Sequence, residues 1–322
     1  MESSLTTSLE VLMQWNRCHG PSFQISESDL RWNLREQDHV HYRTEKLGGV
    51  PVIYALASDR GLAAGLAGGN LWLSLWGEVA SGQENEFARA LVALAAREGK
   101  SRIATAGDEF HFLPGVPEGD ETLITGLKSQ GFEGVVAADF CGDIRSAAVT
   151  SYISEAHLLA AEKKWRFTPV ETAAEFREAE TFLAKEFPGR WLREFQFWKS
   201  RQDTGRGFWS VLRDESGVVL GFARMAVRGR IENLDQGWNP GALRLPLRAG
   251  LSRDATDSCL GPIGVAASLR GQGAGRVLLG FTLETLKDHN AGPICIDWTD
   301  AFKYYYPLQF EVVRKYWTAW RK

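Results

Sequence analysis

Three glycines at alternate positions, Gly271, Gly273 and Gly275, are the clearest chemical feature of this chain. Such a run lets the backbone approach a ligand closely and leaves N–H groups pointing outward, which suits an anion. Arg270 and Arg276 stand at either edge and add positive charge. An amphipathic segment follows, and the positive end of its helix dipole would favour a pyrophosphate at the same place. The run therefore predicts a pyrophosphate site, with a purely structural turn before a core helix as the alternative.

Two well-known nucleotide motifs do not fit this run. A dinucleotide site needs Gly-x-Gly-x-x-Gly, and the sixth position counted from Gly271 is Arg276. A nucleoside triphosphate loop needs Gly-x-x-x-x-Gly-Lys followed by Ser or Thr, and the sequence holds no such run. Neither motif therefore accounts for the glycine run.

The chain around the run alternates strand-like and helix-like segments in a definite order. Thr172 and Glu175 have the spacing of a capping box, which predicts that a helix starts there. Residues 214–217 form a polar, glycine-ended loop between two apolar segments, which is typical of a hairpin. The expected elements are a strand at 165–170, helices from 172 and through 191–198, a hairpin of 208–212 with 218–225, a strand at 260–265, a helix at 275–289 and a strand at 294–298. With a final short helix, the order is β-α-α-β-β-β-α-β-α.

The glycine run, placed after the fourth strand of this order, resembles the coenzyme A pyrophosphate motif of the GNAT acyltransferases. The segment 301–310, AFKYYYPLQF, is similar to the family's closing Ala-x-x-Phe-Tyr-x-x-x-Gly-Phe, with Tyr304 and Tyr305 at the Phe-Tyr pair. Gln309 stands where the family prefers Gly, and Trp298 where it often has Asn. The resemblance covers residues 165–322 and implies an α/β domain with a mixed, α+β type of sheet.

The resemblance also implies the cofactor, acetyl-CoA, and direct transfer of its acetyl group to an amine of a small molecule or peptide. Coenzyme A would lie between two splayed parallel strands, with its pantetheine arm paired to a strand backbone. The expected cofactor-binding residues are Ile263, Gly264, Val265, Arg270, Gly271, Gln272, Gly273, Ala274, Gly275 and Arg276.

Tyr305 is the expected proton donor to the thiolate of coenzyme A, since a tyrosine with a pKa of about 10 keeps its proton at neutral pH. Core packing is the other interpretation of this residue. The base that takes a proton from the amine is expected at Asp297, with Asp300 as a second candidate, although both positions also suit a loop or a helix cap. Three further carboxylates could bind a cationic acceptor: Glu186, Glu232 and Asp235.

The first half of the chain repeats this order in a weaker form, which predicts an internal repeat of about 160 residues. The repeat consists of a hairpin of 52–56 with 62–66, a strand at 71–76, a helix at 86–98 and a strand at 102–105. At the equivalent turn, 80–86, stand one glycine, no arginine and two carboxylates, and acidic groups at a helix start oppose a pyrophosphate. We therefore expect two tandem GNAT-like domains: a degenerate one at 1–148, a linker at 149–164 and an acetyl-CoA-binding one at 165–322.

Composition excludes several other classes of protein. The 322 residues carry 37 Lys and Arg against 40 Asp and Glu, a net charge of -3 that gives no general case for nucleic acid or an anionic membrane. No signal peptide and no apolar run long enough to span a membrane is evident, so a cytoplasmic protein is expected, as monomer or homodimer. The four cysteines are scattered and no Cys/His cluster occurs, so no metal is expected.

Two alternatives for the function stay open. A non-catalytic regulator or scaffold could keep the coenzyme A turn and lack the acceptor chemistry. Another acyl donor, such as succinyl-CoA, would use the same turn. Residues that could face the acceptor are Trp191, Trp238 and the loop 112–117, for which a core position or a plain surface turn is the other interpretation.

Overall fold

A computed structural model of the chain describes residues 40–57, 70–76, 79–105, 115–199, 209–227 and 256–321, with single positions at 9, 10, 13, 16 and 27. Its strands are β1 (Val40–Leu47), β2 (Val50–Ala57), β3 (Asn70–Trp76), β4 (Arg102–Ala104), β5 (Val116–Pro117), β6 (Glu133–Asp143), β7 (Arg166–Pro169), β8 (Trp209–Arg213), β9 (Val219–Val227), β10 (Thr256–Val265), β11 (Ala291–Thr299) and β12 (Glu311–Arg321). They form one mixed sheet in the order β1-β2-β3-β4-β12-β6-β11-β10-β9-β8-β7, with β5 paired to β12 at the side. The expected α/β fold with a mixed sheet is confirmed.

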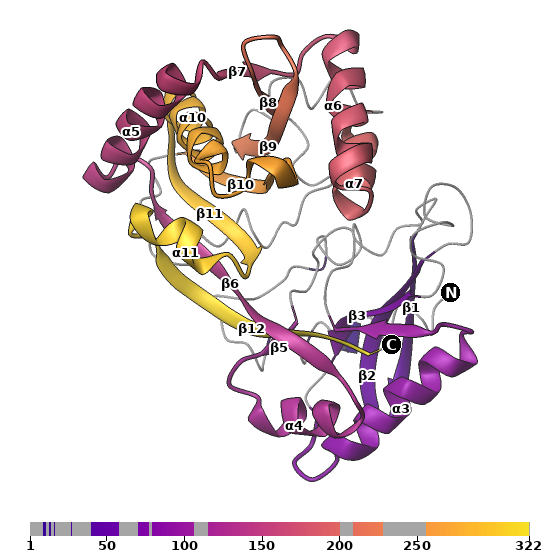
Figure 1. The fold of residues 1–322 in the computed structure, drawn as a ribbon. Helices are drawn as coiled ribbons and strands as arrows, with labels where there is room; N and C mark the ends of the chain where they lie inside the picture. The colour runs from indigo at the N-terminus through magenta and orange to yellow at the C-terminus, as the bar shows by residue number, and fades with distance from the viewer. Residues whose placement is uncertain are drawn as a thin grey trace.

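Helices lie on both faces of the strands of the second half (Figure 1). The helices are α3 (Glu84–Arg97), α4 (Glu121–Ser129), α5 (Ala147–Lys163), α6 (Ala173–Glu186), α7 (Arg190–Lys199), α10 (Ala274–Asp288) and α11 (Phe302–Tyr305), with 3-10 turns η4 (Ala267–Leu269) and η5 (Tyr306–Leu308). The order β-α-α-β-β-β-α-β-α predicted for the second half is confirmed from β7 to α11. The closing strand β12 was not predicted.

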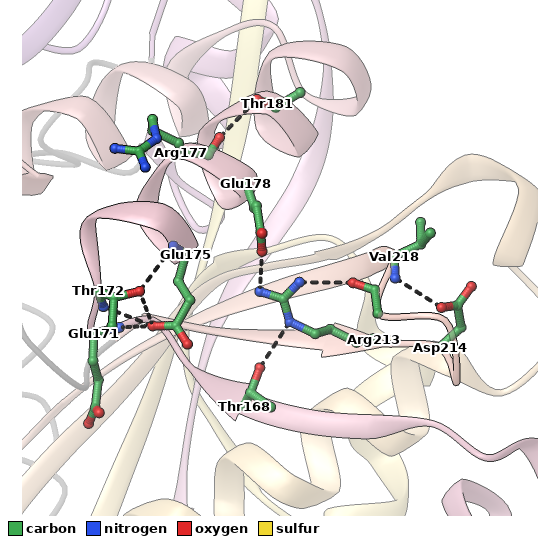
Figure 2. A network of polar contacts seen from close by, with 11 residues as sticks. Thr168, Glu171, Thr172, Glu175, Arg177, Glu178, Thr181, Arg213, Asp214 and Val218 are labelled. Carbon is green, nitrogen blue, oxygen red and sulfur yellow. Dashed lines mark hydrogen bonds and ion pairs between the residues drawn. The ribbon is translucent and has the colours of Figure 1, made fainter.

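Local polar contacts fix the start of this second half, as Figure 2 shows. The capping box is present: the N–H of Glu175 donates to Thr172 Oγ1 at 3.2 Å, and the N–H of Thr172 donates to the Glu175 carboxylate at 2.8 Å. Arg213 of β8 donates to Thr168 of β7 and pairs with Glu178 of α6 at 2.7 Å. One guanidinium therefore ties the first helix of this half to the sheet edge.

The two halves exchange their last strands. β6, which ends the first half, pairs with β11 of the second half, and β12 pairs with β4 of the first. The two exchanged strands lie side by side in an antiparallel pair and cross the molecule from one half to the other (Figure 1). Phe140 of β6 is fully buried in a core of the second half, and Trp317 of β12 is buried in the core of the first. Each half thus completes the hydrophobic core of the other.

The predicted internal repeat is visible in the strand pairing. In the first half, β3 and β4 are parallel and α3 connects them, while in the second half β10 and β11 are parallel and α10 connects them. Both halves precede the parallel pair with two antiparallel pairings, β1·β2·β3 and β8·β9·β10. The repeat therefore lies in topology, as element order indicated.

The prediction that residues 52–56 form a hairpin with residues 62–66 was wrong, because β2 lies between β1 and β3. These residues belong to β2, and β2 pairs with β1 across a two-residue turn, Gly48-Gly49, with both glycines at positive φ. A Gly-Gly pair between strands is a strong hairpin signal because both positions of such a turn require φ > 0. Residues 62–66, the predicted partner, lie outside the described residues.

Residues 149–164, the predicted linker, fall almost entirely within helix α5, which packs lengthwise on α10. Gly280 of α10 makes this approach possible, since an added Cβ there would lie 2.3 Å from the Cβ of Ala156. At the surface, His157 forms a hydrogen bond with Glu284, and Arg276 forms an ion pair with Glu155. The domain boundaries stay a prediction, but this segment is a structural part of the second half.

Candidate functional site

Strands β10 and β11 separate where a ligand was expected between them. Their parallel pairing ends at Leu260↔Ile296, and β10 continues to Val265 paired only with β9 among the described strands. The N–H of Ala266 donates to Leu220 on the β9 side. Successive residues of a strand direct their backbone groups to opposite neighbours, so the N–H and C=O of Val265 face the gap. An extended ligand could therefore pair with Val265, as predicted.

The glycine run forms the turn that opens α10. Gly271 has φ 74° and Gly273 has φ 87°, a left-handed conformation that glycine adopts without strain. Gly273 is the N-cap, and the first helical bond is donated by Val277 to the Gly273 carbonyl. The N–H groups of residues 274–276 precede this bond, so they lack an acceptor within the helix. The turn thus has the open donors that an anion requires.

The two arginines at this turn differ in their surroundings. Arg276 pairs with Glu155 at 2.7 Å, and its guanidinium lies 5.1 Å from the ring centre of Tyr152, so α5 holds it. Arg270 is exposed. Glu186 lies at the other side of the turn, where its carboxylate accepts the N–H of Ala267 at 3.2 Å. That bond, followed by the one from Lys185, lowers the pKa of Glu186.

A cavity of about 280 Å³ opens at the point where β10 and β11 separate. Its walls come from α7, from the irregular part of β10 between Leu260 and Ile263, from the end of β11 and from α11. Ile263 and Ile296 of the two strands line it, and Tyr304 and Tyr305 close one side. Trp191 lines it as well, which agrees with its selection as a residue that could face an acceptor.

The three consecutive tyrosines have three environments. Tyr305 is 3 % exposed and lines the cavity. Tyr304 also lines it, but its hydroxyl donates to the carbonyl of Gly275 in the first turn of α10, and burial raises the pKa of Tyr304 well above its ordinary value. Tyr306 is 59 % exposed. Tyr305 is therefore a buried residue of the cavity wall, and its role as proton donor stays a prediction.

The carboxylates of the cavity only partly match those singled out in the sequence. Asp300 lines the cavity, and so does Glu194 of α7, which sequence reasoning missed. Glu194 pairs at 2.6 Å with Arg224, which is buried in β9. Asp297 is a residue of β11, but its side chain is outside the described part of the chain.

The other candidates for binding an acceptor do not line this cavity as far as the structure describes them. Glu186 binds the turn after β10, as described above. Glu232, Asp235 and Trp238 lie outside the described residues, and so do residues 112–114 of the loop 112–117. Arg190 and Glu194 both line the cavity. They stand four positions apart in one predicted helix and therefore share a face, and this spacing could have indicated Glu194 from the sequence.

Trp298 is held in place by groups from both halves. Its backbone is in the left-handed region at φ 48°, a conformation more usual for Asn, and its N–H donates to Asp139 of β6 at 2.8 Å. Asp139 is fully buried and also binds Arg314 and Tyr316 of β12. The guanidinium of Arg190 lies 4.7 Å from the ring centre of Trp298. The exchanged strands therefore fix the wall of the cavity.

The equivalent turn of the first half is occupied by its own side chain. The N–H of Gly82 donates to the carboxylate of Glu84 at 2.9 Å, and Glu84 is 8 % exposed at the start of α3. The Glu84 carboxylate thus accepts the N–H and lies at the positive end of the α3 dipole, the two features that would otherwise attract a phosphate. This geometry supports the expectation that the first half binds no coenzyme A.

The described residues show no metal cluster, disulfide or membrane-spanning helix. No group of three or more His, Cys, Asp or Glu that could hold a metal ion occurs in that part of the chain. Cys141, Cys259 and Cys295 are buried free thiols. None of the helices described is long and apolar enough to span a bilayer.

Comparison with known proteins finds a family match within the second half. Residues 171–302 match the model of the acetyltransferase (GNAT) family. Across 98 % of its length, this chain is similar to part of a fungal multi-domain GH3 β-N-acetylglucosaminidase described as having a GCN5-related glucosamine N-acetyltransferase region, with a TM-score of 0.71 and 17 % identity. It spans 37 % of that longer protein. No curated protein matches the chain.

Two further solved structures extend the likeness over both halves. A tandem GNAT protein from the clavulanic acid biosynthesis pathway aligns with 99 % of this chain and 95 % of its own, at a TM-score of 0.53 and 13 % identity. A GCN5-related N-acetyltransferase from Sphaerobacter thermophilus aligns with 98 % of this chain and 91 % of its own, at 0.57 and 10 %. The tandem arrangement of two such folds is thus shared.

Proposed function

We propose, from the match of residues 171–302 to the acetyltransferase (GNAT) family model, that the second half of this chain transfers an acetyl group from acetyl-CoA to an amine of a small molecule or peptide. The single observation that carries the proposal is a cavity lined by Tyr305 and by the two strands where they separate, with the open glycine turn joined to its wall by the hydrogen bond from Tyr304 to Gly275. Direct transfer needs these three features: an anion site, an edge for the pantetheine arm and a proton donor.

The residues that would hold acetyl-CoA are those of the turn and the strand gap. The backbone of Gly273 to Arg276 supports the pyrophosphate, and the exposed Arg270 adds charge that is not already paired with α5. The backbone of Val265 faces the gap and suits the pantetheine amide groups. When bound, acetyl-CoA supplies the activated acetyl thioester.

Tyr305 would protonate the departing thiolate. Its burial keeps water away, and a phenol hydroxyl can give its proton to a thiolate. Tyr304 is less suited, since its proton is already donated to Gly275.

An amine acceptor arrives mostly protonated and must lose that proton before it attacks. Asp297 is the predicted base and Asp300 the second candidate, and Asp300 lines the cavity. Glu194 lines it too, but its carboxylate pairs with Arg224, whereas Asp300 is exposed and suits an ammonium group.

The test is release of free coenzyme A thiol from acetyl-CoA in the presence of an amine panel, measured with a chromogenic thiol reagent. We expect Tyr305→Phe to lower kcat by about 10²–10⁴-fold, the usual contribution of a positioned general acid, with the Kd of acetyl-CoA unchanged. Tyr306→Phe is the matched control, because Tyr306 is exposed, and it should behave as wild type.

Two results would oppose this proposal. Equal effects of Tyr305→Phe and Tyr306→Phe would remove Tyr305 from the reaction. Binding of acetyl-CoA without thiol release across the whole panel would instead favour a non-catalytic protein that binds coenzyme A.

A further inference from the structure

A second cavity, of about 330 Å³, lies beside the first and is built by the exchanged strands. Val135 and Ala137 come from β6, Thr318 and Trp320 from β12, and Ala104 from β4 of the first half. Neither half alone supplies these walls. The volume is within the range of small-molecule sites, which starts at roughly 300 Å³.

This cavity occupies a position in the first half that corresponds to the first cavity in the second half. Ala104 ends the parallel pairing of β4 with β3, just as Ile296 ends that of β11 with β10. Ile296 lines the first cavity and Ala104 the second. Because Glu84 fills the phosphate turn of the first half, this second space is open to a use other than binding coenzyme A.

The two cavities share a wall. Trp298 and Asp300 line both of them. Trp298 is fixed by Asp139 below and by the Arg190 guanidinium over its ring, so the partition is anchored. A molecule that placed a reacting atom in the first cavity could extend past Asp300 into the second.

The chemistry of the second cavity is that of an apolar pocket with one charge at its entrance. Its side chains are aromatic, aliphatic or a single threonine, apart from Asp300 at the shared wall. Val135 is 43 % exposed although it is a large apolar residue in the middle of a strand. Burial of this side chain by an apolar group of a ligand would be favourable, because it removes apolar surface from water.

We propose that this second cavity binds the apolar group of the acceptor, so that the acceptor is a primary amine carried on an aromatic or branched aliphatic group. Asp300 receives the ammonium at the shared wall, and Trp298 separates the apolar group from the acetyl site. This inference rests on the proposed acetyl transfer and gives it a substrate class. It also gives the degenerate half a role, since β4 supplies part of the pocket.

The experiment compares two amines, phenethylamine and ethylamine, on wild type and on a matched pair of variants. Val135→Trp fills the cavity, whereas Val136→Trp places the same side chain on the other face of β6, where residue 136, 37 % exposed, does not line it. Wild type is expected to favour phenethylamine in kcat/KM by at least about tenfold, the smaller effects known for apolar pockets. Val135→Trp should abolish this preference by raising the KM of phenethylamine, with ethylamine and acetyl-CoA unaffected, and Val136→Trp should retain it.

A second variant and a binding measurement keep the proposal independent of turnover and of one mutation. Trp320→Ala removes the aromatic wall and should also raise the KM of phenethylamine alone. Calorimetry of phenethylamine in the presence of coenzyme A should show binding to wild type and Val136→Trp but not to Val135→Trp. That pattern without any acetyl transfer would support the pocket and refute the proposed reaction. Equal kcat/KM for both amines in wild type, or equal effects of Val135→Trp and Val136→Trp, would overturn the pocket.

Discussion

The short helix α11 gives neighbouring residues of one type different tasks. Tyr304 turns its hydroxyl back to the carbonyl of Gly275 and so links the cavity wall to the glycine turn. Tyr305 is buried beside the cavity, and Tyr306 faces solvent. Family resemblance aligned Tyr304 and Tyr305 with a Phe-Tyr pair, but the hydrogen bond of Tyr304 depends on a segment far away in the sequence. The sequence therefore indicated which tyrosines belong to this motif, but it could not indicate the hydrogen-bond partner of Tyr304.

Local interactions were predictable for a physical reason. The capping box of Thr172 and Glu175 and the left-handed turn at Gly271 and Gly273 depend on residues within a few positions of each other. Glu194 and Asp139 were missed because their importance comes from partners in other strands, Arg224 and the β12 residues.

At the residue scale, the capping carboxylate gives a testable pH dependence. The N–H groups of Thr172 and Glu171 donate to Glu175 and lower its pKa below the ordinary 4.5. A lowered pKa in the folded state means that the stabilisation is complete above about pH 4.5 and is lost as pH falls through the folded pKa. We expect Glu175→Gln to lower the free energy of unfolding at pH 7 by about 0.3–1 kcal/mol, with the difference from wild type shrinking below pH 4.

Urea denaturation at a series of pH values measures this effect. Glu171→Gln, a change in the neighbouring exposed carboxylate, serves as the control and should follow wild type. A difference between Glu175→Gln and wild type that stays constant from pH 7 to pH 3 would disprove the capping role of the charge.

At the scale of elements, the exchanged strands β6 and β12 organise the site. They were not predicted, because strand pairing across such a separation leaves no local signal: β6 follows β5 and α4 in the chain, yet its partners are β11 and β12. The order of the remaining elements was predictable since hydrophobic period and turn residues are local. Asp139, midway along β6, turns this pairing into geometry by holding Trp298 and Arg314 together.

Removal of that charge is expected to be costly. Burial opposes the charge of Arg314, but the Asp139 carboxylate raises its pKa and keeps it ionised. Asp139→Asn would leave Arg314 partly buried without its counter-charge, and loss of one partner of a buried pair costs about 3–5 kcal/mol. Asp143→Asn changes an exposed carboxylate at the end of the same strand and should cost less than about 1 kcal/mol.

Chemical denaturation of both variants decides the matter. Similar midpoints for Asp139→Asn and Asp143→Asn would mean that the network does not hold the exchanged strands. Near-UV circular dichroism should also report the altered packing of Trp298 in Asp139→Asn alone.

At the scale of the whole molecule, one fold occurs twice and the two copies differ where a phosphate would bind. The second turn has open backbone donors at the start of α10, and the first is closed by Glu84 at the start of α3. The copies nevertheless exchange strands, and Asp139 of β6, which ends the first half, holds Trp298 in the cavity wall of the second. We infer from this difference that coenzyme A binds to the second half and not to the first.

Calorimetric titration of the full chain with acetyl-CoA tests that claim most directly. We predict one site per chain. Arg270→Glu should abolish it, because the exposed Arg270 borders the glycine turn of the second half, and Glu84→Gln in the turn of the first half should retain it. Two sites in wild type, or one site that survives Arg270→Glu and disappears in Glu84→Gln, would contradict the assignment of coenzyme A binding to the second half.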